Sequence, residues 1–283
     1  MFIYVNAKGR ERLAPSMRKN IGFGTMNVVP RGFTIKPGRV KIGNGAEGVI
    51  YAAYRNKTMK NINVHKISKK SSKIIQQREY NITRKIYKIV PKHVVNIRSL
   101  TDTNMVMNMY RGGAIGDWLK NNEVDDNVLR ILILQVISTL FKIHRYDSSF
   151  RHNDLHLGNV FIDDRTTPET KFGRYTVPDL GISIRLADFG FAFDKQYPPL
   201  EDFKNYGIYV GNDIMYDAHF FLNSLYERIV VKRSSKFPLT AKFLIDILGK
   251  YAGLSSAYVF KYRLKAGVKF PHTFDSILEH PYF

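Results

Sequence analysis

The chain of 283 residues lacks cysteine entirely. This absence excludes disulfides, thiolate zinc sites and cysteine nucleophiles, and it fits an intracellular protein. Long apolar runs are also missing, because the longest, residues 128–141, is interrupted by Arg130 and Gln135. A membrane span needs about 20 apolar residues, so none is expected. The N-terminus has no positive region before an apolar core, so we expect no secretory signal.

Acidic residues are scarce, with 24 Asp and Glu against 44 Lys and Arg, which gives a net charge of +20. Residues 55–98 contain thirteen Lys or Arg and one acid, Glu79. A charge of this size attracts polyanions. The basic stretch is interpreted either as a solvated face or as a docking surface for nucleic acid or acidic protein segments. Aromatic residues are not spaced along it as stacking platforms, which disfavours a dedicated nucleic-acid module.

The first part of the chain reads as an extension followed by strands. Residues 1–36 are basic, interrupted by Pro and Gly, and show no sustained period, so we expect a partly irregular N-terminal extension. Residues 39–54 predict two strands joined by a tight turn, and residues 62–67 predict a third. Residues 74–90 carry isoleucines at helical spacing and stop at Pro91, which predicts a helix.

The later part is mostly helical. Residues 103–110 return to a β-like pattern, residues 126–146 predict a long helix, and further helices follow Asp217. Strands first and helices later predict an α+β fold of two lobes. The N-lobe, residues 37–111, is small and β-rich with one main helix, and the C-lobe, residues 112–283, is larger and mostly helical.

A glycine-rich loop, GNGAEG, occupies residues 43–48. Backbone without Cβ atoms can approach phosphates closely. A dinucleotide site would place a helix after the loop and an acid about 20 residues on, but a strand pattern follows here and the next acid is Glu79. Strand, loop and strand are typical of a flap that covers ATP. An ordinary hairpin turn is the alternative.

Lys66 lies in the predicted third strand, where a lysine can grip nucleotide phosphates if a carboxylate holds it. Glu79, on the following predicted helix, is the only acid in the basic stretch and is therefore the expected partner. Lys60 and Lys69 remain alternatives for the phosphate-binding lysine.

Two further motifs, HNDLHLGN and ADFG, carry the chemistry of phosphoryl transfer. We expect Asp154 to orient and deprotonate an attacking hydroxyl, and Asn159 and Asp188 to hold magnesium against the phosphates. An alternative interpretation makes a metal triad of His152, Asp154 and His156, because alternate residues of a strand face the same way. The simplest alternative is that Asp154 and Asn159 only cap turns.

With these elements in this order, the chain resembles the eukaryotic-type Ser/Thr protein kinase family from about residue 38 to its last residue. The resemblance implies that Lys66, Glu79, Asp154 and Asn159 are catalytic. It places Met107 at the gatekeeper position and makes Asp217 the anchor of the catalytic loop. Residues 277–283 look like the last helix of the domain. The implied nucleotide-binding residues are Ile42, Gly43, Asn44, Gly45, Gly48, Ile50, Lys66, Met107, Asn108, Met109 and Tyr110, with backbone groups of the last three facing adenine.

Departures from the family pattern bear on regulation. Asn153 stands where the family has an arginine that reads a phosphorylated activation loop. Between Gly190 and Asp217 there is no Ser or Thr. We therefore predict activity that does not depend on Ser/Thr phosphorylation of this segment. The compact domain and degenerate segment are similar to kinases encoded by large DNA viruses.

Other departures bear on the substrate. His156 replaces the lysine of protein-serine kinases, and DxHxxN is more typical of small-molecule phosphotransferases for aminoglycosides or choline. Residues 163–181 lengthen the spacing between Asn159 and Asp188 and predict a hairpin or loop insertion. A pseudokinase scaffold that binds acidic partners is a further alternative. It is disfavoured because Lys66, Asp154, Asn159 and Asp188 are all of the types that catalysis needs.

The leading prediction is an enzyme that transfers the γ-phosphoryl group of ATP, with Mg²⁺ or Mn²⁺, to Ser/Thr hydroxyls of proteins. Its basic charge favours acidic or nucleic-acid-associated substrates, and nucleic acid is a further partner for the basic surface. The expected location is intracellular, in the host cytoplasm or the virion if the chain is viral.

Overall fold

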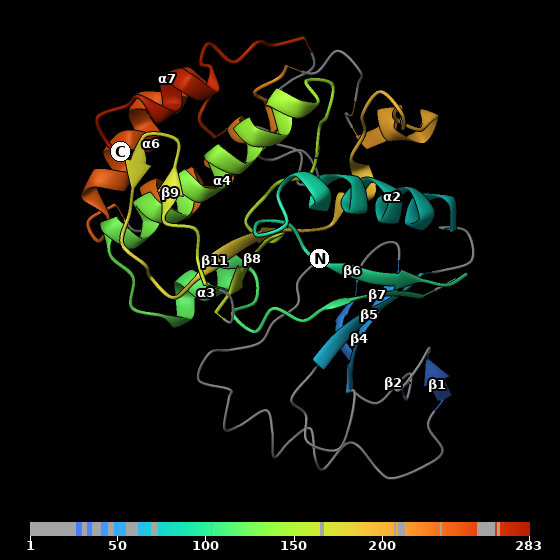
Figure 1. The fold of residues 1–283 in the computed structure, drawn as a ribbon. Coiled ribbons are helices and arrows are strands. Elements are labelled where there is room, and N and C mark those ends of the chain that lie inside the picture. Colours follow the sequence, from blue (N-terminus) through green and yellow to red (C-terminus); the bar gives the residue numbers. More distant parts are fainter. Residues whose placement is uncertain are drawn as a thin grey trace.

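The computed structural model shows two lobes that are joined by residues 108–114 (Figure 1). The α+β arrangement predicted above, a small lobe with the sheet and a larger helical lobe, is confirmed. The described residues are 27–29, 33–35, 41–44, 48–54, 62–68, 73–102, 104–164, 167–206, 208, 213–232, 234–253, 264 and 267–283.

The N-lobe is built on a seven-stranded sheet of order β1-β2-β4-β5-β7-β6, with β3 paired to β4. All of its pairings are antiparallel. The strands are β1 (Asn27–Val29), β2 (Phe33–Ile35), β3 (Lys41–Asn44), β4 (Gly48–Tyr54), β5 (Ile62–Ser68), β6 (Ile97–Leu100) and β7 (Asn104–Asn108).

The strands predicted at 39–54, 62–67 and 103–110 are confirmed. Strands β1 and β2 lie inside the segment predicted as an extension, where three residues are too short to show a period of two. Strand β5 is central in the sheet, and in its register Lys66 pairs with Ile50 of β4 and Met105 of β7. The sheet thus holds the Lys66 backbone from both sides.

Helix α2 (Lys73–Ile89) lies beside this sheet in Figure 1 and confirms the helix predicted from isoleucine spacing. Ile82 and Ile86 are fully buried in the large core that continues into the C-lobe, whereas Ile74 in the first turn is exposed. The helix therefore links the two lobes through its inner face. That face also carries Glu79.

The C-lobe is mostly helical. Its helices are α3 (Ile115–Asn121), α4 (Asp126–Tyr146), α5 (Tyr216–Tyr226), α6 (Pro238–Leu248) and α7 (Phe274–Leu278). Short 3-10 turns occur at η2 (Phe189–Phe191), η3 (Glu201–Tyr206) and η5 (Gly249–Tyr251), and a π-helical turn, η4 (Glu227–Val231), continues α5. The last helix was predicted at residues 277–283, and this position is wrong. Helix α7 begins after its N-cap, Thr273, and ends at Leu278.

Helix α4 confirms the prediction for residues 126–146, and Asp125 caps it by accepting from the backbone N–H of Val128 at 2.9 Å. Within the part of the chain that the structure describes, α4 has the length and mean hydropathy that a membrane crossing requires. However, 72% of its most apolar window is buried inside the fold. We interpret it as the core helix of the C-lobe.

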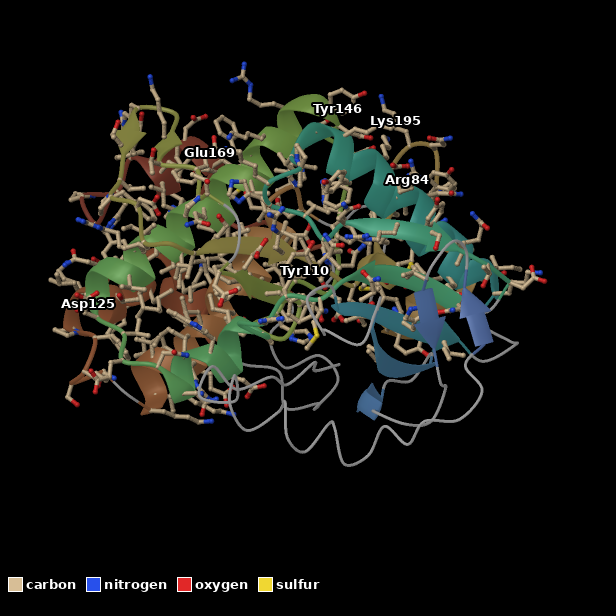
Figure 2. The ribbon with its side chains drawn as sticks, turned by 60° about the horizontal axis from the view of Figure 1, so that its bottom comes forward. Arg84, Tyr110, Asp125, Tyr146, Glu169 and Lys195 are labelled. Atoms are coloured by element: carbon tan, nitrogen blue, oxygen red, sulfur yellow. The ribbon has the colours of Figure 1, made fainter. Side chains whose placement is uncertain are left out.

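The segment between the two catalytic motifs forms an antiparallel strand pair, β8 (Val160–Asp163) with β11 (Ser183–Leu186). The predicted insertion lies between them as a small hairpin, β9 (Lys171–Phe172) and β10 (Tyr175–Thr176), beside α4 in Figure 1. Glu169, labelled in Figure 2, bonds to His93 at 2.9 Å and to Lys142 of α4 at 2.7 Å. The Tyr175 hydroxyl donates to the carbonyl of Leu278.

Candidate active site

Three residues that are far apart in the sequence meet at one ammonium group. Lys66 Nζ lies 2.6 Å from Glu79 Oε2 and 3.0 Å from Asp188 Oδ1. The side chains of Lys66 and Glu79 are 6% and 5% exposed, so the pair is nearly dry. Strand β5 supplies the lysine, α2 supplies the glutamate, and η2 follows the aspartate. The structure thus brings together three of the predicted site residues.

The charges of this cluster stabilise one another. Burial alone lowers the pKa of Lys66, but the carboxylates of Asp188 and Glu79 outweigh it, and the net pKa is raised. Burial likewise raises the pKa of Asp188, but the charge and hydrogen bond of Lys66 outweigh it and bring the pKa to about 2. At neutral pH Lys66 is therefore a cation and Asp188 an anion.

The catalytic loop, residues 151–159, places Asp154 and Asn159 against each other. The Asn159 amide nitrogen donates to the backbone carbonyl of Asp154 at 2.8 Å and to its carboxylate Oδ2 at 3.1 Å. His156 Nε2 lies 3.7 Å from the same carboxylate oxygen, and His156 Nδ1 accepts from the N–H of Gly158 at 3.0 Å. Asp154 is thereby oriented by two neighbours.

Burial lowers the pKa of His156 below its ordinary value, and the negative charge of Asp154 offsets only part of that effect. The ring is consequently neutral at pH 7. A neutral imidazole therefore occupies the position at which the kinases that the sequence resembles have a lysine.

The loop is anchored from below by Asp217 of α5, which is fully buried. Its two carboxylate oxygens accept from the backbone N–H groups of His152, at 2.7 Å, and Asn153, at 2.8 Å. Asn153 has a φ of 64°, a left-handed conformation that asparagine adopts more readily than most residues. Its side chain donates to the carbonyl of Phe191 at 3.0 Å and so ties the loop to the segment after Asp188.

A divalent metal fits the donor set at Asn159 and Asp188. The Oδ1 atom of Asn159 is buried and has no hydrogen-bond partner, so it is an acceptor that a cation would satisfy. Asp188 supplies the carboxylate that Mg²⁺ and Mn²⁺ prefer. Among the described residues no group of three or more His, Cys, Asp and Glu is placed to hold a metal. The alternative triad is wrong: His152 instead bonds to the carbonyl of Ala187 at 2.9 Å and packs on Phe189.

An apolar cluster spans the two lobes. It joins Ile50 and Met107, both predicted for nucleotide binding, to Val64 of β5, Phe161 of β8 and Ala187, all 7% exposed or less. Flat apolar walls of this kind are typical of small-molecule pockets. Val64, Phe161 and Ala187 were not among the predicted site residues. Because alternate residues of a strand face the same side, Val64 could have been found two residues before Lys66, and Phe161 two residues after Asn159.

The stretch at the end of β7, residues 108–110, carries the backbone groups predicted to face adenine. The N–H of Asn108 donates to the carbonyl of Asn96 at 3.0 Å, and the carbonyl of Tyr110 accepts from Gly113 at 3.1 Å. These two groups are committed inside the protein. The Tyr110 side chain, labelled in Figure 2, is buried and accepts from the N–H of Asn96 at 2.9 Å. Contacts between adenine and the backbone of residues 108–110 stay a prediction.

Gly112 is required where the chain enters the C-lobe, because a Cβ at this position would lie 2.6 Å from Ile162 Cβ. In the glycine-rich loop, Ile42, Gly43 and Asn44 lie in β3 and Gly48 begins β4. Gly45 lies outside the described residues, as do the alternative lysines Lys60 and Lys69. The loop joins two paired strands, which matches the predicted strand, loop and strand order.

A pocket of about 400 Å³ opens beside the catalytic loop. Its walls come from His156–Gly158, from α3 and from the π-helical turn after α5. Three basic residues (Lys120, Arg228, Lys232) and two acidic ones (Asp117, Glu227) line it. His156 lines this pocket and also lies 3.7 Å from the Asp154 carboxylate, so the pocket adjoins the catalytic loop at this residue.

The comparisons with known proteins agree with this geometry. Residues 38–219 match the model of the protein kinase domain, which is more than half of the chain. The chain therefore belongs to the protein kinase family, whose members use ATP and a divalent metal.

Two relatives are described as serine/threonine-protein kinases. Zyg-1 of Caenorhabditis briggsae is 28% identical over 154 residues, covering 54% of this chain and 20% of the relative. R400 of Acanthamoeba polyphaga mimivirus is 29% identical over 132 residues, covering 40% of this chain and 28% of the relative. The chain thus spans less than a third of either relative's length.

Proposed function

We propose that the chain is an active protein kinase that transfers the γ-phosphoryl group of ATP to Ser/Thr hydroxyls of proteins. One observation carries this proposal: Lys66 is held between Glu79 and Asp188, while Asn159 orients Asp154 in the facing loop. A scaffold that had lost catalysis would have no need to retain both groups. The names of the two relatives support Ser/Thr as the acceptor class.

Each residue then has a defined task. The Lys66 ammonium binds phosphate oxygens of the nucleotide, and Glu79 keeps it aimed at them. The Asp154 carboxylate positions the acceptor hydroxyl and takes its proton. Asn159 and Asp188 would hold Mg²⁺ or Mn²⁺, which when bound neutralises charge on the phosphates. Ile50, Val64 and Phe161 enclose the purine and exclude water from it.

Loss of a general base costs roughly a factor of 100 to 10,000 in rate. We expect Asp154→Ala to lose phosphate transfer to a mixed protein substrate by about that factor, with an unchanged melting temperature. Asp246→Ala, on the exposed surface of α6, is the control and should keep full activity. Equal rates for Asp154→Ala and the parent chain would show that the site is assigned wrongly. Absence of both transfer and an MgATP-induced thermal shift in the parent chain would favour the scaffold.

Activity without Ser/Thr phosphorylation of the segment after Gly190 is part of the proposal. Between Gly190 and Asp217 the sequence offers no Ser or Thr, and Asn153 bonds to the carbonyl of Phe191 instead of reading a phosphate. Protein treated with a phosphatase should retain its full rate. A stoichiometric activating phosphate on residues 191–216, found by mass analysis, would contradict this.

A second candidate is phosphate transfer to a small hydroxylated amine, and the neutral His156 beside Asp154 favours it. The two acceptor classes separate in one assay with radiolabelled ATP. We expect label on casein or on the chain itself, without added small molecules. Turnover only in the presence of an amino alcohol would reverse the assignment.

A further inference from the structure

Helix α2 carries a buried arginine that contacts the segment following Asp188. One guanidinium nitrogen of Arg78 donates to the backbone carbonyls of Ala192, at 3.1 Å, and Tyr197, at 2.6 Å. The guanidinium carbon also lies 5.7 Å from the centre of the Phe203 ring. Arg78 is 7% exposed, so these contacts are shielded from water.

Lys85 lies two helical turns further along the same side of α2. Its ammonium donates to Asp147 Oδ2 and to Asp194 Oδ2, both at 2.8 Å. The Asp194 side chain is fully buried, and its other oxygen accepts from the N–H groups of Gln196 and Tyr197 at 2.8 Å. One ammonium thus joins α2, the end of α4 and a turn in the segment after Asp188.

Glu79 lies on the same helix between these two residues, directly after Arg78 in the chain. Helix α2 cannot draw Glu79 away from Lys66 without also withdrawing Arg78 and Lys85 from their partners. Withdrawal of Lys85 would leave the buried Asp194 carboxylate without its cation, which is strongly unfavourable in a medium of low dielectric. A position of α2 in which Glu79 has left Lys66 is therefore disfavoured by charged side chains of the chain itself, without any added phosphate.

We propose that Arg78 and Lys85 are positioning residues that lock α2 to the segment after Asp188 and so hold Glu79 against Lys66. Together with Asp147 and Asp194 they form the α2 clamp. Asp194 provides, as a carboxylate, the anion that an added phosphate would otherwise provide. The inference rests on the proposed function and states how its active arrangement is maintained.

The test compares two Lys→Met variants of one helix. Lys85→Met removes the clamp, whereas Lys88→Met removes an exposed lysine one turn later. We expect Lys85→Met to lower kcat/KM for protein substrate about tenfold, and Lys88→Met to leave it unchanged. Lys85→Arg, which keeps the charge, should recover most of the loss. Equal kcat/KM for Lys85→Met and Lys88→Met would overturn the proposal.

A double-mutant cycle with Glu79→Gln separates positioning from general damage. If Lys85 acts through Glu79, then Lys85→Met adds little to the loss already caused by Glu79→Gln. Additive losses in the double variant would mean that Lys85 acts elsewhere, and the proposal would fall. Should Lys85→Met not fold, as judged by circular dichroism, Lys85→Gln takes its place in the cycle.

Hydrogen exchange tests the clamp independently of activity. Lys85→Met should speed amide exchange in residues 75–89 and 191–200 relative to Lys88→Met. This readout applies even if the parent chain transfers no phosphate, an outcome that would reject the proposed function alone. Identical exchange in the two variants would reject the clamp alone.

Discussion

At the scale of single residues, Asp188 has two tasks in the proposed function: it pairs with Lys66 and would also bind the metal. Its left-handed φ of 61° turns the chain sharply at this point. That conformation costs of order 1–3 kcal/mol for a residue other than glycine, and it persists only where the surroundings enforce it. The surrounding fold therefore holds the Asp188 backbone in this conformation before any ligand binds.

Asp188→Asn should abolish the thermal shift that MgATP or MnATP gives the parent chain, because the neutral amide is a poorer ligand for a hard cation. The measurement is melting temperature against metal concentration at constant ATP. Asp202→Asn, an exposed Asp→Asn change in η3, is the matched control. An undiminished shift in Asp188→Asn would place the metal elsewhere.

Contacts between single residues can be predicted from the sequence where one residue type is scarce. Glu79 could be paired with Lys66 because the basic stretch contains no other acid, and the structure places the two groups 2.6 Å apart. Ala187 could not be predicted in the same way. Its place in the apolar cluster arises only when residues of both lobes come together.

Among the secondary-structure elements, helix α5 supports the catalytic loop, although it carries none of the predicted catalytic residues. Its Asp217 satisfies two buried N–H groups of the catalytic loop at once. The element therefore sets the shape of the loop that carries Asp154.

Asp217→Asn should destabilise the fold by about 1–3 kcal/mol, because an amide offers one acceptor and turns a donor towards the second N–H. Urea unfolding measures this change. Asp246→Asn, on the surface of α6, should cost less than about 0.5 kcal/mol. A value for Asp217→Asn no larger than the control would mean that the loop is held by other contacts.

The insertion hairpin gives a prediction for pH. The hydrogen bond from His93 lowers the pKa of Glu169 from 4.5 to about 2, with Lys142 contributing and burial opposing. A depressed carboxylate pKa stabilises the fold above the unfolded-state value, and this contribution is lost as the pH falls from about 4.5 to about 2. Because the side chain is 25% exposed, screening reduces the effect to about 1–2 kcal/mol.

Glu169→Gln should therefore be less stable than the parent chain at pH 7 and equally stable near pH 2. Thermal unfolding across this range measures the difference. Glu279→Gln removes a 62% exposed partner of Arg174 and should change little at any pH. A deficit in Glu169→Gln that persists undiminished to pH 2 would contradict the assigned ion pair.

Elements with a strong period were predictable and short ones were not. Helices α2 and α4 show isoleucine and leucine spacing over four or more turns, and both were predicted nearly to the residue. Strand β6 has four residues and α3 has seven, which is too few for a period to emerge. The tertiary fold, rather than the local sequence, decides such segments.

At the scale of the whole molecule, the net charge of +20 raises the rate at which acidic substrates associate with the protein. We expect kcat/KM for an acidic peptide to fall about tenfold or more as salt rises from roughly 50 to roughly 300 mM, because screening removes the long-range attraction. A peptide of the same length with neutral residues in place of the acids should show little change. Parallel salt curves for the two peptides would remove the proposed preference for acidic substrates.

The insertion hairpin has a practical consequence. Its turn at Gly173 has a φ of 58° and open space around it. Glu169, just before β9, bonds to Lys142 of α4, and Tyr175 of β10 bonds to the end of α7. Exposed turns of this kind tolerate inserted sequence. A short epitope or a fluorescent label placed after Gly173 would be carried by this hairpin of the C-lobe. It would report on binding to partners without touching the residues that bind nucleotide.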